Sequence, residues 1–449
     1  MSVAGLLAEI ADIGRDPASG GYRRFAFSRP DAALAEWFAA QASSRGLDVT
    51  TDRNGNQYAW WGDGAAGDAV LTGSHLDSVP DGGPLDGPLG VAAALVAVDL
   101  LRASGFHPAR PLGVVRFVDE EGARFGLACS GSRLLTGAAD PHRVLTLRDA
   151  DGTTYAEAMA AAGLDPRHAG RDDALLRRVG AFVELHVEQG RGLVDLGATV
   201  GVASLIRPHG RWRIEIAGRA DHAGTTRLVD RDDPMLALAR LVQDARRAAE
   251  HQAALATVGR IDVRPNAVNA IPSAVTAWLD VRADSEEQVR AVLAELADAG
   301  FAAVEESWTA ATPLDGDLTA RVRAAVAAMS AVGAGSAVGA EGGVGVAGAV
   351  RGASVHDHRQ GCDGDHARSR QVPGSGRGWV PVLATGAGHD AGVLAQAGVP
   401  TAMLFVRNPT GLSHAPAEHA EPADCEAGAV ALAAVLRDLC GPPCEDGRP

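Results

Sequence analysis

The sequence has few cysteines, and none of them forms the pattern of a disulfide framework or of a thiolate zinc site. Its five cysteines are scattered along the chain, and no C-x-x-C pair occurs; they are Cys129, Cys362, Cys425, Cys440 and Cys444. Small disulfide-bonded domains and thiolate metal sites use cysteines paired at short spacings. The sequence therefore favours a protein of the reducing cytoplasm.

Long apolar runs and an excess of basic residues are also absent. The longest strongly apolar stretch, Val91–Val98, is far shorter than the roughly 20 residues of a transmembrane helix. Residues Met1–Gly20 lack the basic start and apolar core of a signal peptide. Lysine and arginine number 41 against 56 acidic residues, a net charge of −15, which disfavours nucleic acid and anionic membranes as partners. We expect a cytoplasmic protein whose partner is a small molecule.

What the sequence does have is enough material for two domains, with 449 residues of which 46% are hydrophobic. A capping-box pattern at Ser28–Asp31 predicts a helix that ends near Gly46. Near-continuous apolar runs then alternate with helical stretches such as Leu89–Ser104, which predicts a largely parallel sheet covered on both faces. The predicted buried strands are Ala69–Thr72, Leu112–Val118, Ala181–Val187 and Val399–Val406.

The middle of the chain has a different pattern. Period-two alternation at Trp212–Ile216 and Val275–Arg282, with a third strand near 256–263 and a fourth beginning at Phe301, predicts half-exposed strands. Helices are predicted from Asp233–Pro234 to about His251 and from the cap at Ser285 to Gly300. The order β-α-β-β-α-β predicts a ferredoxin-like unit inserted into an α/β domain. We therefore predict a catalytic domain over 1–207 and 312–449 and a lid or dimerisation domain over 208–311.

Residues 333–378 interrupt this organisation. They begin with glycine, alanine and valine and continue with arginine, histidine and serine, which predicts an irregular or disordered insert. The string Gly343–Gly348 matches G-x-G-x-x-G, but no strand precedes it, so we interpret it as glycine-rich composition. A second metal site or a solvated tract without a fixed role would each fit the potential ligands here, which are His356, His358, Cys362 and His366.

Potential metal ligands follow several of the predicted strands. His75, Asp77 and Asp86 lie in the segment after the first strand, Asp119–Glu121 end the second, and His186 lies near the end of the third. His414 follows the last strand, within Thr410–Glu418. Taken singly, each could be a solvated turn, an acidic strand end or a core histidine. Because the carboxyl ends of parallel strands share one sheet edge, and because imidazole and carboxylate bind zinc or manganese, the set together favours a metal centre. Asp77 could accept the second N–H of His75 and set its tautomer.

These blocks resemble the amidase branch of the M20 metallopeptidase superfamily, which includes allantoate amidohydrolases, N-carbamoyl-L-amino acid hydrolases and β-ureidopropionases. The resemblance covers roughly residues 20–325 and 380–435. It implies two divalent cations, zinc or manganese, one held by His75, Asp86 and His186 and the other by Asp86, Glu121 and His414. Glu120 would then be the general base, and Asp77 would orient His75.

The resemblance also implies that the inserted domain recognises substrate and forms a homodimer. Asn269 and Arg282 would grip a substrate carboxylate, and His222 would stabilise the oxyanion, reaching across a dimer interface. Gln189 and His389 would line the pocket. Arg227 stands where many members have proline; an extra contact to an anionic substrate and a salt bridge to Asp230 or Asp232 are both open.

Among functions, our first choice is an allantoate amidohydrolase, because Phe125–Arg133 and His222–Pro234 resemble chains of that name. Hydrolysis of an N-carbamoyl or N-formyl amino acid, by the same residues, is the alternative. A metal-dependent exopeptidase is disfavoured, because His186 replaces the acidic residue that peptidase relatives carry. A non-catalytic binding protein is disfavoured because Glu120 and all five ligands are present.

Overall fold

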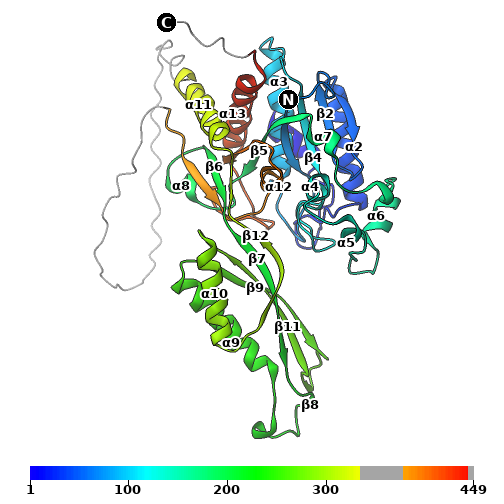
Figure 1. Ribbon diagram of the computed structural model, residues 1–449, viewed down its shortest axis with the longest axis vertical. Coiled ribbons are helices and arrows are strands. Elements are labelled where there is room, and N and C mark those ends of the chain that lie inside the picture. The colour runs from blue at the N-terminus through cyan, green and yellow to red at the C-terminus, as the bar shows by residue number, and fades with distance from the viewer. Residues whose placement is uncertain (334–377, 443–449) are drawn as a thin grey trace, which may run out of the picture.

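A computed structural model describes residues 1–333 and 378–442, and a nine-stranded mixed sheet is the centre of its larger part (Figure 1). The strand order is β1-β2-β4-β3-β5-β15-β6-β13, with β14 also paired to β6. The strands are β1 (Asp48–Thr51), β2 (Gln57–Trp61), β3 (Ala69–His75), β4 (Leu112–Phe117), β5 (Val179–Val187), β6 (Val200–Ile206), β13 (Thr312–Pro313), β14 (Val382–Thr385) and β15 (Thr401–Val406). The four central strands, β4, β3, β5 and β15, are mutually parallel, whereas antiparallel pairs flank them.

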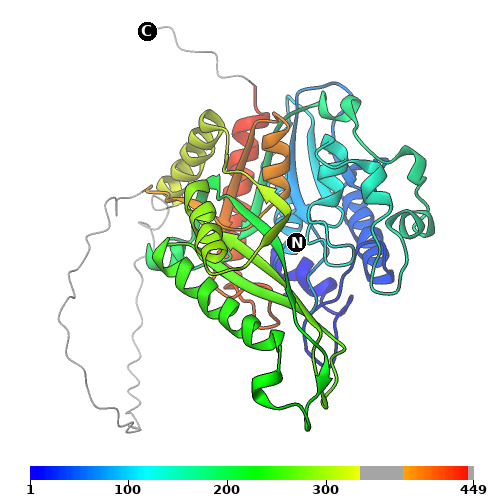
Figure 2. The same cartoon turned by 60° about the horizontal axis from the view of Figure 1, so that its bottom comes forward.

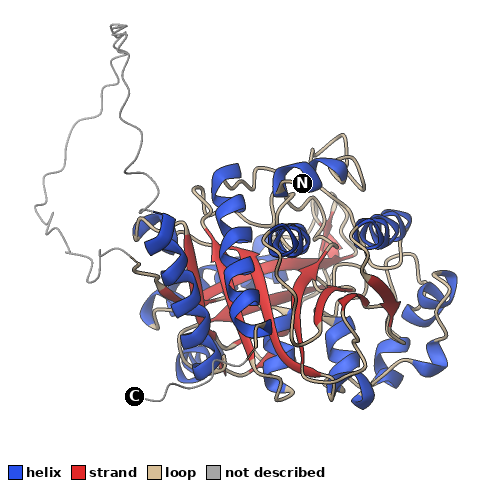
Figure 3. Ribbon diagram, turned by 90° about the horizontal axis from the view of Figure 1, so that it is seen from above, coloured by secondary structure: helices blue, strands red, loops and turns tan. Residues whose placement is uncertain are grey.

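Both faces of this sheet are covered by helices, as Figure 3 shows from above. Alternating residues of β5 enter different cores: Val183 and Leu185 pack with one set of helices, and Phe182 packs with the other. The first set is α1 (Val3–Glu9), α2 (Arg29–Ser44), α3 (Pro88–Ala103), α11 (Gly316–Gly333) and α13 (Pro422–Cys440). The second face carries α4 (Ser130–Thr136), α7 (Asp173–Leu176) and α12 (Asp390–Gln396). This burial on both faces explains why most residues of the central strands are apolar.

Short helices complete this part of the molecule. They are α5 (Pro141–Leu145), α6 (Tyr155–Ala161), the 3-10 helix η1 (Pro166–His168) and α8 (Gly192–Asp195). α5 and α6 pack in a small cluster around Tyr155 and Met159, beside the loop that follows β4.

The smaller part is a four-stranded antiparallel sheet with two helices on one face, drawn toward the viewer in Figure 2. Its elements are β7 (His209–Ala217), α9 (Pro234–His251), β9 (Leu255–Arg264), β11 (Ala274–Arg282), α10 (Glu286–Asp298) and β12 (Ala303–Thr309). The order β12-β7-β11-β9 and the sequence β-α-β-β-α-β match the predicted ferredoxin-like unit. The fold-class prediction is confirmed, whereas the exact boundaries at 208 and 311 stay predictions.

Local chemistry explains why these elements begin where they do. The Asp233 side chain accepts the Met235 amide at the start of α9, and Pro234 occupies the first turn. Ser285 and Gln288 form a reciprocal capping box on α10. On β11, Val275 and Leu279 are buried against these helices in the period of two that the sequence predicted.

A two-stranded ribbon, β8 (Asp221–His222) with β10 (Ala270–Ile271), and the 3-10 helix η2 (Leu228–Asp230) form the outer end of the smaller part. Figure 1 places β8 at the end farthest from the large sheet.

Several sequence predictions fall outside the described residues. They include 334–377 of the predicted insert, with the glycine string Gly343–Gly348 and the potential ligands His356, His358, Cys362 and His366. Cys444 also lies outside the described residues, in 443–449. Of the described cysteines, Cys129, Cys425 and Cys440 are buried free thiols. Among the helices of residues 1–333 and 378–442, none is both long and apolar enough to cross a membrane.

Candidate metal centre

The carboxyl ends of the four parallel strands bring the five predicted ligands together. His75 is the last residue of β3, and His186 is the penultimate residue of β5. Glu121 follows β4, His414 follows β15, and Asp86 lies on the loop that leads into α3. Two groups form, His75–Asp86–His186 and Asp86–Glu121–His414, and in each the potential ligand atoms lie within 4.8 Å of one another. Asp86 is common to both groups.

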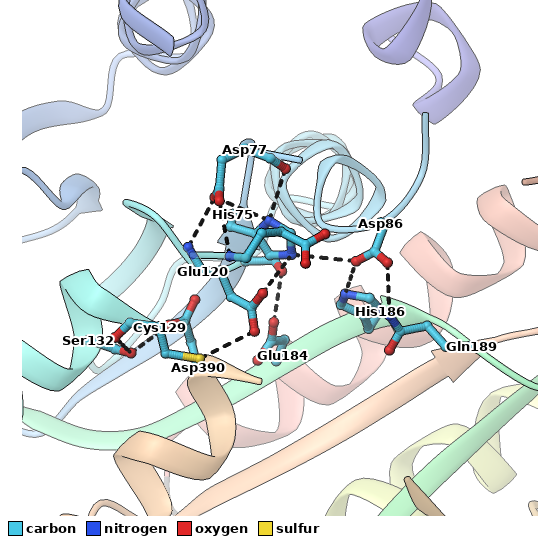
Figure 4. A network of polar contacts seen from close by, with 12 residues as sticks. His75, Asp77, Asp86, Glu120, Cys129, Ser132, Glu184, His186, Gln189 and Asp390 are labelled. Carbon is cyan, nitrogen blue, oxygen red and sulfur yellow. Dashed lines mark hydrogen bonds and ion pairs between the residues drawn. The ribbon is translucent and has the colours of Figure 1, made fainter. Parts of the chain in front are cut away.

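Distances around Asp86 divide its two carboxylate oxygens between the groups. Figure 4 shows the contacts of Asp86 with His75 and His186 in the first group. Its Oδ1 lies 3.2 Å from His186 Nε2 and 3.6 Å from His75 Nε2. Its Oδ2 lies 3.3 Å from His414 Nε2, which is 3.5 Å from Glu121 Oε2. A carboxylate placed in this way can bridge two cations.

Unpaired buried atoms show that the site fits divalent cations. The Nε2 atoms of His75 and His186 and the Oε1 atom of Glu121 are buried without a hydrogen-bond partner. In contrast, His186 Nδ1 is 2.8 Å from the Val187 carbonyl oxygen, which directs Nε2 toward Asp86. Unsatisfied buried polar atoms are costly. Cations bound between these atoms would remove that cost.

The number of buried carboxyl groups also favours a site for cations. Burial raises the pKa of Glu120 well above its usual value against the effect of His75, and the charge of Glu121 raises it further. Burial and the charge of Asp86 raise the pKa of Glu121 to about 7. Burial would also raise the pKa of Asp86, but the close approach of His186, His414 and His75 outweighs burial and holds this pKa well below its usual value. So many carboxyl groups in a buried space are stabilised by positive charge.

Asp77 supports both the first histidine and the acidic segment after β4. Its Oδ1 lies 3.4 Å from His75 Nδ1 and accepts the Glu120 amide at 3.2 Å. Its Oδ2 accepts the Glu121 amide at 3.0 Å. Asp77 therefore contacts His75 and also holds the backbone that presents Glu120 and Glu121.

Glu120 lies beside the predicted ligands and belongs to neither group of them. It is 6% exposed, and its Oε2 lies 3.8 Å from His75 Nε2. Its Oε1 accepts a hydrogen bond from the Cys129 thiol, with 3.3 Å between sulfur and oxygen. A carboxylate that lines the cavity beside potential ligands can accept and donate a proton there.

A cavity of about 1000 Å³ opens from this centre toward β7 and β12. Its lining includes Asp86, Glu120, Glu121 and His414, together with the predicted substrate residues Gln189, Arg282 and His389. The ring centroids of His389 and His186 lie 4.5 Å apart, and the buried Nε2 of His389 has no hydrogen-bond partner.

Two of these substrate residues already have partners. The Gln189 amide nitrogen donates to Asp86 Oδ2 at 2.8 Å. The Arg282 guanidinium donates to both Asp280 oxygens at 2.7 and 3.1 Å and to the Gly386 carbonyl at 2.7 Å. Arg282 therefore links the smaller sheet to the loop that carries His389.

His222 and Asn269 are not brought to the centre within this chain. Both are exposed on the β8–β10 ribbon, where the Ala223 amide donates to the Asn269 carbonyl at 3.0 Å. Neither lines the cavity. Arg227, also at this end, pairs with Asp230 at 2.5 Å, which is the salt bridge that the sequence left as one of two options.

Several residues that support the site were not predicted from the sequence. Glu184 is fully buried beneath it and accepts the Ser74 hydroxyl at 2.7 Å and the Ala391 amide at 3.0 Å. Its place two residues before His186 on a strand was a signal, because such residues share a face. The same Glu184 lies near His186 and His389, but its oxygens already accept these two hydrogen bonds. Ser413 donates to Asp86 Oδ2 at 2.7 Å, and no sequence pattern indicated that contact.

Known proteins are similar to this chain in both sequence and fold. The model of peptidase family M20/M25/M40 matches residues 71–355 and 369–438. An N-carbamoyl-L-amino acid amidohydrolase of Geobacillus stearothermophilus is 34% identical, over 95% of this chain and 95% of that protein. An allantoate amidohydrolase of Escherichia coli K12 is 30% identical, over 96% and 95%. The crystal structure of an amidase of the hydantoinase/carbamoylase family from Burkholderia vietnamiensis matches with a TM-score of 0.79 and 31% identity, over 98% and 97%.

Proposed function

The chain belongs to peptidase family M20/M25/M40, in its hydantoinase/carbamoylase amidase branch, and is a hydrolase of C–N bonds; from this we propose that it cleaves a ureido or amide C–N bond of a small carboxylate substrate with two divalent cations. The observation that carries the proposal is the arrangement of His75, His186, His414 and Glu121 around Asp86, with unpaired buried nitrogens on two of the histidines.

In this proposal His75, Asp86 and His186 hold one cation, and Asp86, Glu121 and His414 hold the other. When bound, two such cations polarise a scissile carbonyl and lower the pKa of an attacking water. Zinc and manganese both suit a set of imidazole and carboxylate ligands.

Glu120 is the proposed general base and acid. Its carboxyl group faces the cavity, where it takes a proton from water and returns it to the departing nitrogen. A ureido carbonyl is a weak electrophile because nitrogen lone pairs delocalise into it, so a positioned base is needed. Asp77 keeps Glu120 in place through the backbone amide and keeps His75 in one orientation.

Arg282, Gln189 and His389 are the proposed substrate contacts from this chain, because all three line the cavity. A guanidinium binds a carboxylate through two parallel hydrogen bonds. To bind a substrate carboxylate, Arg282 must give up at least part of its pairing with Asp280. Asp280 is only half-buried, so water can replace the lost hydrogen bonds.

His222 and Asn269 are proposed to act in the site of a second copy. Both are exposed on the β8–β10 ribbon, away from the cavity of their own chain, so a role in catalysis requires another chain. β9 is the outermost strand on one side of the smaller sheet, and Leu255 and Ile261 on it are exposed. A homodimer formed through this part would cover such an edge.

Allantoate is the substrate we propose first, with release of ammonia, carbon dioxide and a ureidoglycine-type product. The segments Phe125–Arg133 and His222–Pro234 support it by their resemblance to allantoate amidohydrolases. The test is turnover of purified protein, loaded with manganese or zinc, on allantoate beside N-carbamoyl and N-formyl amino acids, with a chelator-treated control. Ammonia released from allantoate together with a ureidoglycine-type product is the expected result. Absence of turnover on every amide and ureide would overturn the proposal.

An N-carbamoyl-L-amino acid is the second candidate, favoured by the 34% identity to the Geobacillus stearothermophilus protein. The same residues would act on it, because it too joins a ureido group to a carboxylate. A free α-amino acid formed in step with ammonia would select this substrate.

A further inference from the structure

Glu418 lies behind the shared ligand Asp86, in the loop that follows β15. Its side chain is buried, and its residue is 5% exposed. One carboxylate oxygen, Oε2, accepts the backbone amides of Leu85 and Asp86 at 2.8 and 3.0 Å. The acceptor therefore fixes the backbone of the residue whose side chain faces both groups of potential ligands.

The Asp86 loop is shaped to receive this carboxylate. A Cβ atom at Gly83 would lie 2.3 Å from Glu418 Cβ and 2.4 Å from its Oε2, so a side chain there would displace Glu418. On the other side, Gly87 has φ +84°, and a Cβ there would lie 2.4 Å from the His75 ring. The loop is thus held between Glu418 and His75, with glycine at both close approaches.

A second connection runs through Ser413. Its hydroxyl lies 2.7 Å from Asp86 Oδ2 and 3.2 Å from Glu418 Oε1. One hydroxyl proton can serve only one acceptor, and the shorter distance assigns it to Asp86. Because Ser413, His414 and Glu418 share one loop, the strand end that supplies His414 also holds Asp86.

We propose that Glu418 is a positioning residue for cation binding, which holds the Leu85–Asp86 backbone and aligns the shared carboxylate with His414. This inference rests on the proposed function, because it assumes that Asp86 binds cations. Glu418 itself is not in either group of potential ligands, and its Oε2 is used by two amides.

If Glu418 acts by holding the Asp86 backbone, the affinity for Mn²⁺ should depend on the length of its side chain and not on its charge. In Glu418→Gln the amide oxygen can still accept both backbone amides, whereas in Glu418→Asp the charge remains on a side chain one methylene too short. Glu418→Ala loses both. Outer residues that orient ligands typically change metal affinity about 10- to 100-fold. We expect that loss for Ala and Asp and a loss below about threefold for Gln.

The measurement is calorimetric titration of the chelator-treated full chain with Mn²⁺ alone, together with thermal unfolding of the metal-free protein. Asp172→Ala is the matched control: Asp172 Oδ1 also accepts two backbone amides, those of Ala174 and Leu175, both at 3.1 Å. Asp172 caps α7 and belongs to neither group of potential ligands. We expect this control to lower stability and to keep the wild-type affinity for Mn²⁺. Should Glu418→Ala fail to fold, the Asp and Gln variants carry the test.

Three results would overturn the positioning role: unchanged affinity in Glu418→Ala and Glu418→Asp, equal losses in Gln and Asp, or an equal loss in the Asp172 control. The first would make Glu418 irrelevant, the second would make charge decisive, and the third would reduce the effect to general stability. A wild-type chain that binds neither Mn²⁺ nor, in a second titration, Zn²⁺ would overturn the proposed function, and this inference with it. Two bound ions with unaltered variants would overturn the inference alone.

Discussion

The candidate functional residues are buried and close together at the ends of the parallel strands, but exposed at the tip of the smaller part. Around Asp86, side chains from β3, β5 and the segments after β4 and β15 converge, and most of them are buried. On the β8–β10 ribbon, His222 and Asn269 are exposed, and neither lines the cavity. A parallel sheet gathers residues within one chain, because its strands end at one edge. A protruding antiparallel ribbon presents its residues to solvent, where another molecule can reach them.

Removal of Asp86 tests the buried side of this comparison with the largest expected effect. In Asp86→Ala both groups of potential ligands lose their shared member. We expect metal content to fall from two ions per chain to none, and turnover to fall to that of chelator-treated wild type. Elemental analysis after desalting and a product assay measure both. A variant that keeps two ions would contradict the role of Asp86.

A substitution of Glu120 distinguishes proton transfer from metal binding. Glu120→Gln should lower kcat about 10²- to 10⁴-fold, the usual contribution of a general acid–base. Metal content should stay at the wild-type level, because Glu120 belongs to neither group of potential ligands. The exposed Glu157→Gln, on α6, is the matched control and should act as wild type. Loss of metal in Glu120→Gln would show that the residue is a ligand instead.

His222 tests the exposed side. His222→Ala should lower kcat about 10²- to 10³-fold, as loss of an oxyanion donor does, without loss of metal. If the residue acts in the site of the partner copy, an equal mixture of His222→Ala and Glu120→Gln chains that exchange subunits should regain about a quarter of wild-type turnover, since half of the dimers are mixed and each holds one complete site.

The same mixture distinguishes the alternatives. If His222 acted within its own chain, every chain in the mixture would keep one defect and turnover would stay at the level of the single variants. Sedimentation of the wild type gives the oligomeric state independently.

Arg282 joins the two regions, and its effect should be intermediate. Lysine cannot form two parallel hydrogen bonds to a carboxylate, and hydrogen bonds to charged groups contribute about 1.5–3 kcal/mol. Arg282→Lys should therefore raise KM about 10- to 100-fold, with a smaller change in kcat. Steady-state kinetics on the substrate and on its amide analogue provide the check. An equal KM for the two substrates in wild type would remove the carboxylate contact.

Arg227 should have the smallest effect. It is exposed and pairs with Asp230 on η2, and such surface pairs contribute at most about 1 kcal/mol. Arg227→Ala should leave turnover and the preference between mono- and dicarboxylate substrates unchanged. A selective loss on dicarboxylates would revive the extra cationic contact and draw this residue into the site.

The main elements of both regions were predicted from the sequence, but the edges of the large sheet were not. The apolar runs Ala69–Thr72, Leu112–Val118 and Ala181–Val187 predicted the central strands, and the polar residues at or after their ends predicted the sheet edge where the ligands meet. Both signals are local, because they depend on hydrophobic period and on the order of strands and helices along the chain. The ferredoxin-like unit followed from strict alternation on β11 and from caps at Asp233 and Ser285. The antiparallel flanks of the large sheet had no such signal, since pairing direction depends on how distant segments return.

By itself, the sequence determined the order of the elements, the buried faces and the residue types available at each strand end, all of which depend on neighbours along the chain. Only the tertiary structure decided which atoms meet: that Asp86 divides its oxygens between two groups, that Glu418 holds the Asp86 backbone, and that Arg282 already pairs with Asp280. Contacts across more than three hundred residues, such as Glu418 with Asp86, arise from packing of the whole chain. No local pattern specifies them.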